Sequence, residues 1–429
     1  MTTGDDAGQT DLLRKERFGA LFYRRADSTF TTLTGPEARL LVAATERSIL
    51  DCFARDRCGL EQDDLTFSET VVRWRQQGLL DCSFRCRARV VDNPRDRPGL
   101  GSPLVAHLQL TRACNLQCAH CYFVPSREPA ANELDEDEIE RLAAQLEAMG
   151  TPLIVISGGE PLRRRDLVAI GESMGRHRLD AWLCTNATLV DAALAAQLAA
   201  GPWRGISISV DGADANSHDQ LRGRGNFERA LRGIRLLLEA GARELQLRVT
   251  VTSHSVHQLL ELAALAERLG VSRIVCKPYS AAGMGGRGRD LELARSVYDD
   301  AIARARENWP HRGVCIDFSD GMPTRPPAWT GIAPTFGCVA GTTSITISPD
   351  GKVAGCASLF DAADWTLRQK SLVQCWRDAP GLTRWRALVA DAACQACRRL
   401  AECGGGCRAR ALEAGNGWGG VDPWARCPT

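Results

Sequence analysis

Three closely spaced cysteines are the part of this sequence best suited to chemistry. Cys114, Cys118 and Cys121 follow one another with the spacing Cys-x3-Cys-x2-Cys. Thiolates at this spacing can hold three corners of a four-iron cluster, and because no fourth cysteine follows at short range, one iron is left open to a small molecule. Zinc is the alternative metal, but three thiols with no fourth ligand nearby suit zinc poorly. The triplet therefore favours a reactive iron–sulfur cluster.

Cysteine content sets the chain apart from an average composition. There are 18 cysteines in 429 residues. In the reducing interior of a cell, clustered cysteines more often indicate metal than disulfide bonds. Ten of the 18 fall into two ordered patterns, of which the triplet is the first. The other eight are expected to be buried as small apolar residues.

Charge and hydropathy exclude some partners and locations. The formal net charge is +1, so we expect neither nucleic acid nor an anionic membrane as a partner. No run of 18 apolar residues occurs, and the polar, acidic residues 1–11 do not look like a signal peptide. We therefore expect a cytoplasmic protein with no membrane segment.

The triplet follows the first of several apolar runs that alternate with helix-period segments. Such alternation is typical of an α/β fold with parallel strands and crossover helices. In residues 227–240, for example, apolar side chains return at intervals of three and four. Six such units form an open barrel, whose reactive groups lie where strands end and loops begin. The expected strands are 105–110, 153–156, 181–184, 205–210, 245–251 and 273–277.

The first hundred residues look like a separate small domain. Residues 18–23 and 29–33 are strand candidates, and Thr34 with Glu37 forms the capping box of a following helix. A second helix is expected over residues 67–77. The polar segment 92–102, interrupted by Pro and Gly, is typical of a linker. We divide the chain into residues 1–100, 101–325 and 326–429.

The triplet, followed at once by Tyr122, resembles the cluster motif of the radical S-adenosylmethionine (radical SAM) enzymes. Their fold is a partial (β/α)6 barrel of the TIM type. The segment 157–161, Ser-Gly-Gly-Glu-Pro, follows the second expected strand and closely matches the family's second motif. The resemblance implies that the open iron chelates the methionine part of SAM, and that the reduced cluster cleaves SAM to a 5′-deoxyadenosyl radical.

The resemblance also implies a set of SAM contacts. Paired glycines let a backbone approach a ligand closely, and the 157–161 segment would bind the SAM amino group. Ser209 and Asp211 would face the ribose or carboxylate, and Arg222 would pair with the carboxylate. For Asp219, a structural role as a helix cap or in an ion pair is nearly as good an interpretation as a functional role. The expected cofactor contacts are Tyr122, Ser157, Gly158, Gly159, Glu160, Pro161, Thr185, Asn186, Ser209, Asp211 and Arg222.

The sixth expected strand brings three reactive side chains toward the same end of the barrel. Cys276, Lys277 and Tyr279 could each exchange a proton or a hydrogen atom with a substrate. For Cys276, packing is the better interpretation. The sequence does not single out a catalytic group among them.

Seven cysteines in the last hundred residues form the second pattern, which resembles the SPASM domain with its two auxiliary four-iron clusters. The resemblance assigns one cluster, called distal, to Cys394, Cys397, Cys403 and Cys427, and the other, called proximal, to Cys338, Cys356 and Cys407. A pair of zinc sites is the alternative. The proximal cluster would keep an open iron unless Cys315 or Cys375 fills it. With the triplet, the chain would hold three [4Fe-4S] clusters.

The resemblance implies a peptide maturase. Residues 1–100 resemble the winged-helix-like recognition element that binds the leader of a ribosomally made peptide. The enzyme would abstract a hydrogen from that peptide and close a thioether or carbon–carbon cross-link, with electrons from a donor such as flavodoxin or ferredoxin. One alternative is a sulfatase-maturase-like oxidation of a protein Cys or Ser to formylglycine. Another, from a different class, is a zinc-bound scaffold or binding protein.

Overall fold

The structure is a computed structural model. It describes residues 10–56, 64–93, 99–123, 125–282, 288–309, 313–318, 338–387, 391–398, 400–403 and 405–425. Cys427, the predicted last ligand of the distal cluster, lies outside these residues, as does the middle of the predicted linker. Among the described residues, no helix combines the length and apolar composition needed to cross a bilayer.

A ten-stranded sheet forms the centre of the molecule, in the order β11-β10-β9-β8-β7-β6-β5-β12-β13-β14. Neighbours from β11 to β12 pair in parallel, and β13 and β14 are antiparallel additions. All six predicted strands are present, so the prediction of an α/β fold with a parallel sheet is confirmed. The strands are β5 (Val105–Gln109), β6 (Leu153–Ser157), β7 (Asp180–Thr185), β8 (Trp203–Ser209), β9 (Leu245–Val251), β10 (Arg273–Pro278), β11 (Cys315–Phe318), β12 (Ser344–Ile347), β13 (Lys352–Ala354) and β14 (Trp365–Thr366).

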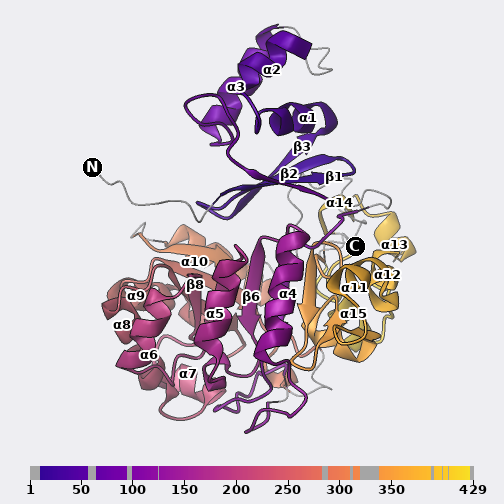
Figure 1. The fold of residues 1–429 in the computed structure, drawn as a ribbon. Coiled ribbons are helices and arrows are strands. Elements are labelled where there is room, and N and C mark those ends of the chain that lie inside the picture. The colour runs from indigo at the N-terminus through magenta and orange to yellow at the C-terminus, as the bar shows by residue number, and fades with distance from the viewer. Residues whose placement is uncertain are drawn as a thin grey trace.

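Helices cover the outer face of this curved sheet (Figure 1). In α8 the predicted period is confirmed, since the apolar side chains spaced by three and four are buried. The helices are α4 (Glu136–Ala148), α5 (Leu167–Arg176), α6 (Ala192–Ala200), α7 (Ala215–Arg222), α8 (Asn226–Glu239), α9 (Leu259–Leu269) and α10 (Arg295–Glu307). Short 3-10 turns lie at η2 (Pro161–Arg163), η3 (Val256–Gln258), η4 (Arg289–Leu291) and η6 (Ala357–Ala362).

The N-terminal region is a separate four-stranded sheet with helices on one face. Its strands are β1 (Leu12–Glu16), β2 (Gly19–Arg24), β3 (Thr29–Thr34) and β4 (Arg89–Asp92), in the order β3-β2-β1-β4. Its helices are α1 (Gly35–Ala43), α2 (Ile49–Asp56) and α3 (Asp64–Gln76). The predicted capping box is present, with the Thr34 backbone N–H donating to Glu37 Oε2 at 2.9 Å.

Sequence analysis missed the strands β1 and β4. In β1 the charged side chains of Arg14 and Glu16 are buried as an ion pair, with 2.7 Å between Nε and Oε1. Because two charged residues are buried here, the sequence lacks the alternation of apolar and polar residues that indicates a strand. Their burial depends on partners from distant segments, because Arg14 also donates to the carbonyl of Gly150 at 3.0 Å.

The N-terminal sheet is attached to one end of the barrel. Asp180, the first residue of β7, accepts hydrogen bonds from Tyr23 at 2.6 Å and from Arg25 at 2.8 Å. Arg14 reaches Gly150, which precedes β6. These contacts lie at the end of the barrel where the strands begin. Helix α7 and the loops that follow the strands lie at the opposite end (Figure 1). The N-terminal unit therefore stands at the end of the barrel opposite the cysteine triplet.

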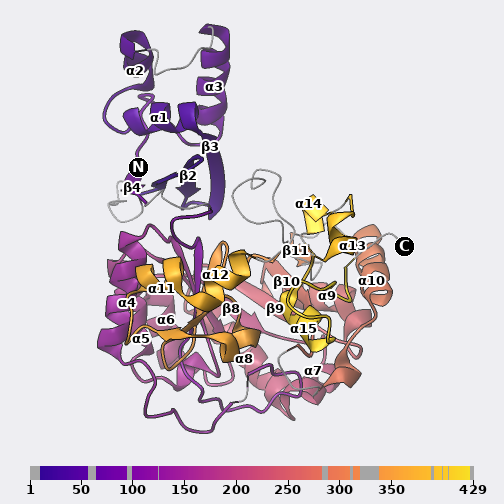
Figure 2. The ribbon, with the colours of Figure 1, turned by 90° about the vertical axis from the view of Figure 1, so that its right-hand side faces the viewer.

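The C-terminal region continues the barrel rather than standing apart. Strand β12 pairs with β5, with Ser344 opposite Val105. Leu372, Trp376 and Leu382 join the same hydrophobic core as the barrel strands. Figure 2 shows α11 and α12 crossing in front of the barrel from this side. The helices are α11 (Leu372–Asp378), α12 (Pro380–Arg386), α13 (Ala392–Gln395), α14 (Leu400–Cys403) and α15 (Arg408–Glu413).

Candidate active site

The cysteine triplet lies in the loop after β5, and all three side chains are half-buried. Burial raises the pKa of Cys118 to about 12; Arg222 opposes this effect, whereas Cys121 adds to it. The thiols thus sit close to one another in surroundings where a thiolate needs a cation to be stable. No three potential ligands in the described ranges meet as a formed metal site. The donor set suits an iron–sulfur cluster, and cluster binding by this loop remains a prediction.

The glycines of the 157–161 segment have a different role from the one we expected. A Cβ added to Gly158, whose φ is +127°, would lie 2.6 Å from the carbonyl oxygen of Thr111. A Cβ on Gly159 would lie 2.3 Å from that of Ala113. Backbone hydrogen bonds of 2.8 Å join Gly159 to Thr111 and Glu160 to Ala113. The missing side chains therefore make room for the cysteine loop itself, and not only for a ligand.

Gly159→Ala is expected to destabilise the fold by about 1 to 3 kcal/mol, because the added methyl group overpacks a backbone contact. It should also lower the iron content of the protein, since Ala113 directly precedes Cys114. Gly35→Ala is the matched control, because its added Cβ would meet only Arg39 Nη1 at 3.7 Å. Urea unfolding of the two variants tests the prediction. Equal stability of both would contradict the close contact seen at Gly159.

Glu160 is buried and binds the chain itself. Its carboxylate accepts hydrogen bonds from Thr185 Oγ1 at 2.7 Å, from the backbone N–H of Asn186 at 2.8 Å and from that of Leu162 at 3.0 Å. Burial raises the pKa of this carboxyl, and the hydrogen bonds oppose the shift. Glu160 thus ties the loop after β6 to the loop after β7, which makes it a positioning residue.

The loop after β7 is also tied to the cysteine loop. Asn186 Nδ2 donates to Asn115 Oδ1 at 3.0 Å, and Asn115 Nδ2 donates to Thr188 Oγ1 at 2.8 Å. Ala187 has a φ of +56°, the left-handed conformation that favours glycine. Thr185 and Asn186 therefore lie beside the cysteine loop, and their contact with SAM stays a prediction.

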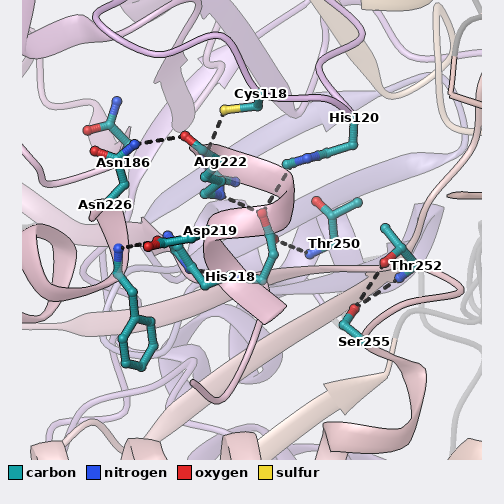
Figure 3. Close-up of polar contacts among 12 residues, drawn as sticks. Cys118, His120, Asn186, His218, Asp219, Arg222, Asn226, Thr250, Thr252 and Ser255 are labelled. Atoms are coloured by element: carbon teal, nitrogen blue, oxygen red, sulfur yellow. Dashed lines mark hydrogen bonds and ion pairs between the residues drawn. The ribbon is translucent and has the colours of Figure 1, made fainter. Parts of the chain in front are cut away.

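Asp211 is the centre of a buried polar network, and its partners Arg222, His120 and Thr250 are labelled in Figure 3. Its carboxylate is fully buried and receives Arg222 Nε, the backbone N–H of Thr250 at 2.8 Å and His120 Nε2 at 3.2 Å. Burial would raise the pKa of Asp211, but Arg222 and His120 outweigh it, so the pKa lies far below its usual range. A permanent carboxylate thus joins the cysteine loop, α7 and β9.

Asp211 and Arg222 are both predicted SAM contacts, and both have partners within the chain. The carboxylate of Asp211 is bound by groups from three other segments, and a SAM contact at either residue stays a prediction. Arg222 Nε donates to Asp211, and its Nη1 lies 4.0 Å from Cys118 Sγ, so the guanidinium lies against the cysteine loop. For Asp219 the structural interpretation holds, since Oδ1 accepts from the backbone N–H of Phe227 at 2.8 Å at the start of α8.

Known proteins resemble this chain in sequence as well as in fold. The family model of the radical SAM superfamily matches residues 108–266. The mycofactocin maturase MftC of Mycobacterium ulcerans is 30% identical over 333 residues, which cover 76% of this chain and 88% of that protein. The chain belongs to the radical SAM superfamily. An AdoMet-dependent heme synthase of Nitratidesulfovibrio vulgaris is also 30% identical, over 71% of this chain and 87% of the relative.

Solved structures share the radical SAM fold at low sequence identity. SuiB of Streptococcus suis, bound to its precursor peptide SuiA, has a TM-score of 0.73 at 17% identity, covering 96% of this chain and 97% of SuiB. The protein anSMEcpe with bound AdoMet has a TM-score of 0.61 at 16% identity, covering 75% and 93%. The prediction of a radical SAM enzyme is confirmed, and the cofactors of this family are SAM and a four-iron cluster.

His120 is a residue of the radical SAM loop that sequence analysis missed. Its ring is buried, and among the described residues Nδ1 has no hydrogen-bond partner. An unsatisfied buried polar atom between two cluster cysteines fits a site that a cofactor completes. The signal in the sequence was a ring-bearing residue inside the triplet itself, between Cys118 and Cys121.

The other predicted SAM contacts lie around this loop. Tyr122 follows the triplet and accepts a hydrogen bond from Gln109 Nε2 at 3.2 Å. Ser157 ends β6 opposite Gln109, and Ser209 ends β8 opposite Arg248. Pro161 begins the turn η2. These residues remain predicted contacts of SAM.

The three predicted proximal cysteines of the C-terminal region lie close to one another. Burial raises the pKa of Cys338 far above its usual range, and the neighbouring Cys407 and Cys356 add to the shift. Burial likewise raises the pKa of Cys356 to about 11, with Cys407 the next cause. Cys375, by contrast, packs in the core, and Cys315 is exposed on strand β11 at the end of the sheet.

Two of the predicted distal cysteines lie on short helices. Cys394 belongs to α13 and Cys403 to α14, and the Cys397 backbone N–H donates to the Cys394 carbonyl at 3.1 Å. Cys427 is outside the described residues. Both auxiliary clusters therefore remain predictions.

Proposed function

We propose that this radical SAM enzyme modifies a ribosomally made precursor peptide and closes a cross-link within it, either thioether or carbon–carbon. The observation that carries the proposal is the N-terminal sheet, which is fixed to the barrel and keeps an edge strand. Two similar proteins support a peptide substrate: the mycofactocin maturase, and SuiB, whose structure was solved with its precursor peptide bound. We also propose that the enzyme works in the cytoplasm.

Residues 1–100 would hold the leader of the peptide. Strand β3 pairs with β2 and stands at the end of the sheet order, so its outer edge can accept an added strand. Main-chain hydrogen bonds to such an edge give affinity without demanding one sequence. The ion pair between Arg25 and Asp180, both nearly buried, keeps this sheet in a constant place relative to the barrel.

The first site would hold SAM and one cluster. Cys114, Cys118 and Cys121 would ligate the iron, and the loops joined by Glu160 would surround SAM. Held there, SAM and the cluster would supply the radical chemistry needed to remove a hydrogen from the substrate. The residues of the chain keep the reacting atoms in place and exclude competing reactions.

The C-terminal cysteines would form a SPASM domain with two further clusters. Cys338, Cys356 and Cys407 would hold the proximal cluster. Its fourth iron would stay open, because Cys375 packs in the core and Cys315 is exposed on β11. Cys394, Cys397, Cys403 and Cys427 would hold the distal cluster. These clusters would accept the electron released when the cross-link closes, and flavodoxin or ferredoxin would reduce the first cluster.

The test is the intact mass of the precursor peptide encoded beside the enzyme, after anaerobic coexpression. Each cross-link is expected to lower the mass by about two units, because two hydrogens leave. Fragmentation should stop between the two joined residues. An aldehyde that reacts with a hydrazide would instead indicate formylglycine, the product of the alternative function. An unchanged peptide mass, with SAM cleavage intact, would rule out the peptide assignment.

A further inference from the structure

The inner face of the barrel sheet is lined by polar side chains. Along β9, alternate residues beginning with Leu245 are buried in the core shared with the helices. The intervening residues, Gln246, Arg248 and Thr250, therefore point to the inner face. On β10 the same rule puts Cys276 in the core and Lys277 on the inner face. Packing is thus the role of Cys276, whereas Lys277 faces the space inside the barrel.

Among the described residues, two cations on this inner face have no carboxylate within ion-pair distance. Arg248 has one hydrogen bond among the described residues, from Nη1 to Cys184 Sγ at 3.9 Å, and no carboxylate within ion-pair distance. Lys277 has no ion pair in the same ranges, and its side chain is exposed to the space inside the barrel. By contrast, Arg273 on the same strand lies 3.8 Å from the carboxylate of Asp317.

The two cations also repel one another. The charge of Arg248 is the largest cause that lowers the pKa of Lys277 to about 8, and Cys184 and Asp317 oppose the shift. His107 adds no charge, because burial, together with Lys277 and Arg248, lowers its pKa to about 4. An anion placed between the two cations would relieve their repulsion.

A second observation indicates a ligand at Gln109, whose partner Tyr122 lies within electrostatic reach of Arg248. Gln109 is only 1% exposed, and its Nε2 donates to the Tyr122 hydroxyl at 3.2 Å. Within the described part of the chain, its Oε1 has no donor. Gln109 belongs to the inward-facing row of β5, two residues beyond His107. A buried acceptor without a donor is costly, so it fits a ligand that brings an N–H group. A peptide brings both an N–H group and carboxylates.

We propose that Arg248 and Lys277 bind a carboxylate of the precursor peptide, beside the residue that is modified. The proposal rests on the function proposed above and deepens it by naming the substrate chemistry. The carboxylate comes either from an Asp or Glu side chain or from the end of the peptide chain. Arg222 is not available in the same way, because Asp211 already neutralises it. The two inner cations thus determine which stretch of peptide is presented to the radical.

The test uses the reconstituted holoenzyme and three forms of the precursor peptide encoded beside it. One form is native, one has every Asp and Glu of its modified half replaced by Asn and Gln, and one ends in a carboxamide. With wild-type enzyme, one of the two neutralised forms should lose about tenfold or more in kcat/KM, the usual worth of a charge-assisted hydrogen bond. That form identifies the source of the carboxylate.

The enzyme variants are Arg248→Gln and Lys277→Gln, with Arg273→Gln as the matched control. In each of the first two, native and neutralised peptides should be processed at nearly equal, lowered rates. The control should discriminate as the wild type does. Thermal unfolding and the affinity for SAM are measured for every variant, and both should be unchanged.

Each other outcome overturns the proposal in a recognisable way. If the wild type processed all three peptides equally, the two cations would not bind a peptide carboxylate. The proposed modification of the peptide would be unaffected by this result. A loss of SAM affinity equal to the loss of turnover in Arg248→Gln and Lys277→Gln would assign the cations to SAM. Wild-type enzyme that cleaves SAM but leaves the native peptide unchanged would overturn the peptide function and this inference together.

Discussion

Replacing Cys118 by alanine is expected to abolish SAM cleavage and to lower the bound iron from about twelve to about eight atoms per chain. The triplet offers only three thiols, and two cannot hold a four-iron cluster that already lacks a fourth ligand from the protein. The loop itself should keep its fold, because the hydrogen bonds to Ser126 and Phe123 come from Cys114 and Cys121. Iron analysis after anaerobic reconstitution, together with assay of 5′-deoxyadenosine, measures both effects.

Cys276→Ala is the matched control for Cys118→Ala. Cys276 is 1% exposed and packs in the core of the barrel. Its loss should leave iron and SAM cleavage unchanged while lowering stability by about 1 kcal/mol, through the small cavity left behind. A Cys118→Ala protein that kept the iron content of this control would show that the triplet does not hold a cluster.

Asp211→Asn is expected to destabilise the fold by about 3 to 5 kcal/mol, the usual cost of removing one partner from a buried ion pair. Arg222 is 11% exposed and would keep its charge with no anion beside it, and an amide cannot accept from three donors at once. The cysteine loop would also lose the contact through His120. The free energy of unfolding, measured in denaturant, and the affinity for SAM should therefore both decrease.

The pH dependence gives Asp211→Asn a second readout. The folded pKa of Asp211 is lowered, so its stabilising effect is complete above the ordinary aspartate pKa of about 4 and is lost only as the pH falls toward the folded value. The difference in unfolding free energy between wild type and variant should thus be constant from about pH 5 to about pH 8.

Glu128→Gln is the control for Asp211→Asn, because it weakens the exposed pair with Arg163, in which Nη2 and Oε2 lie 3.4 Å apart. Exposed ion pairs contribute about 0 to 1 kcal/mol, so this variant should lose little stability and no SAM affinity. If Asp211→Asn were as mild as this control, the buried network would not be what holds the cysteine loop in place.

Local pattern was enough to predict the barrel. Strand β9 was predicted over the residues it occupies, and the apolar period of α8 predicted which of its side chains are buried. In both elements the periodicity comes from one face packing on the core, which a sequence displays directly. In β1 the prediction failed, because Arg14 and Glu16 are buried against each other and against segments far along the chain.

The candidate site was predictable in its chemistry and less so in its contacts. The triplet and the Gly-Gly-Glu-Pro segment were recognisable from residue types alone. Their contacts were not, since the glycines face the backbone of the cysteine loop and Glu160 binds Thr185 and Asn186. The pairing of Asp211 with Arg222 could not be read from the sequence, and the contacts of both residues with SAM stay predictions.

The sequence by itself determined the radical SAM family and the six strands after the cysteine-free linker, because these depend on spacing within short segments; it also predicts which cysteines bind iron. Only the tertiary structure decided that Asp211 joins His120 to Arg222 and that Lys277 and Arg248 face the inside of the barrel. It also decided that the N-terminal sheet stands at the end of the barrel opposite the cysteine triplet. The physical reason is that a buried charge or an unsatisfied acceptor acquires its role from partners on other strands, which come near only when the sheet closes.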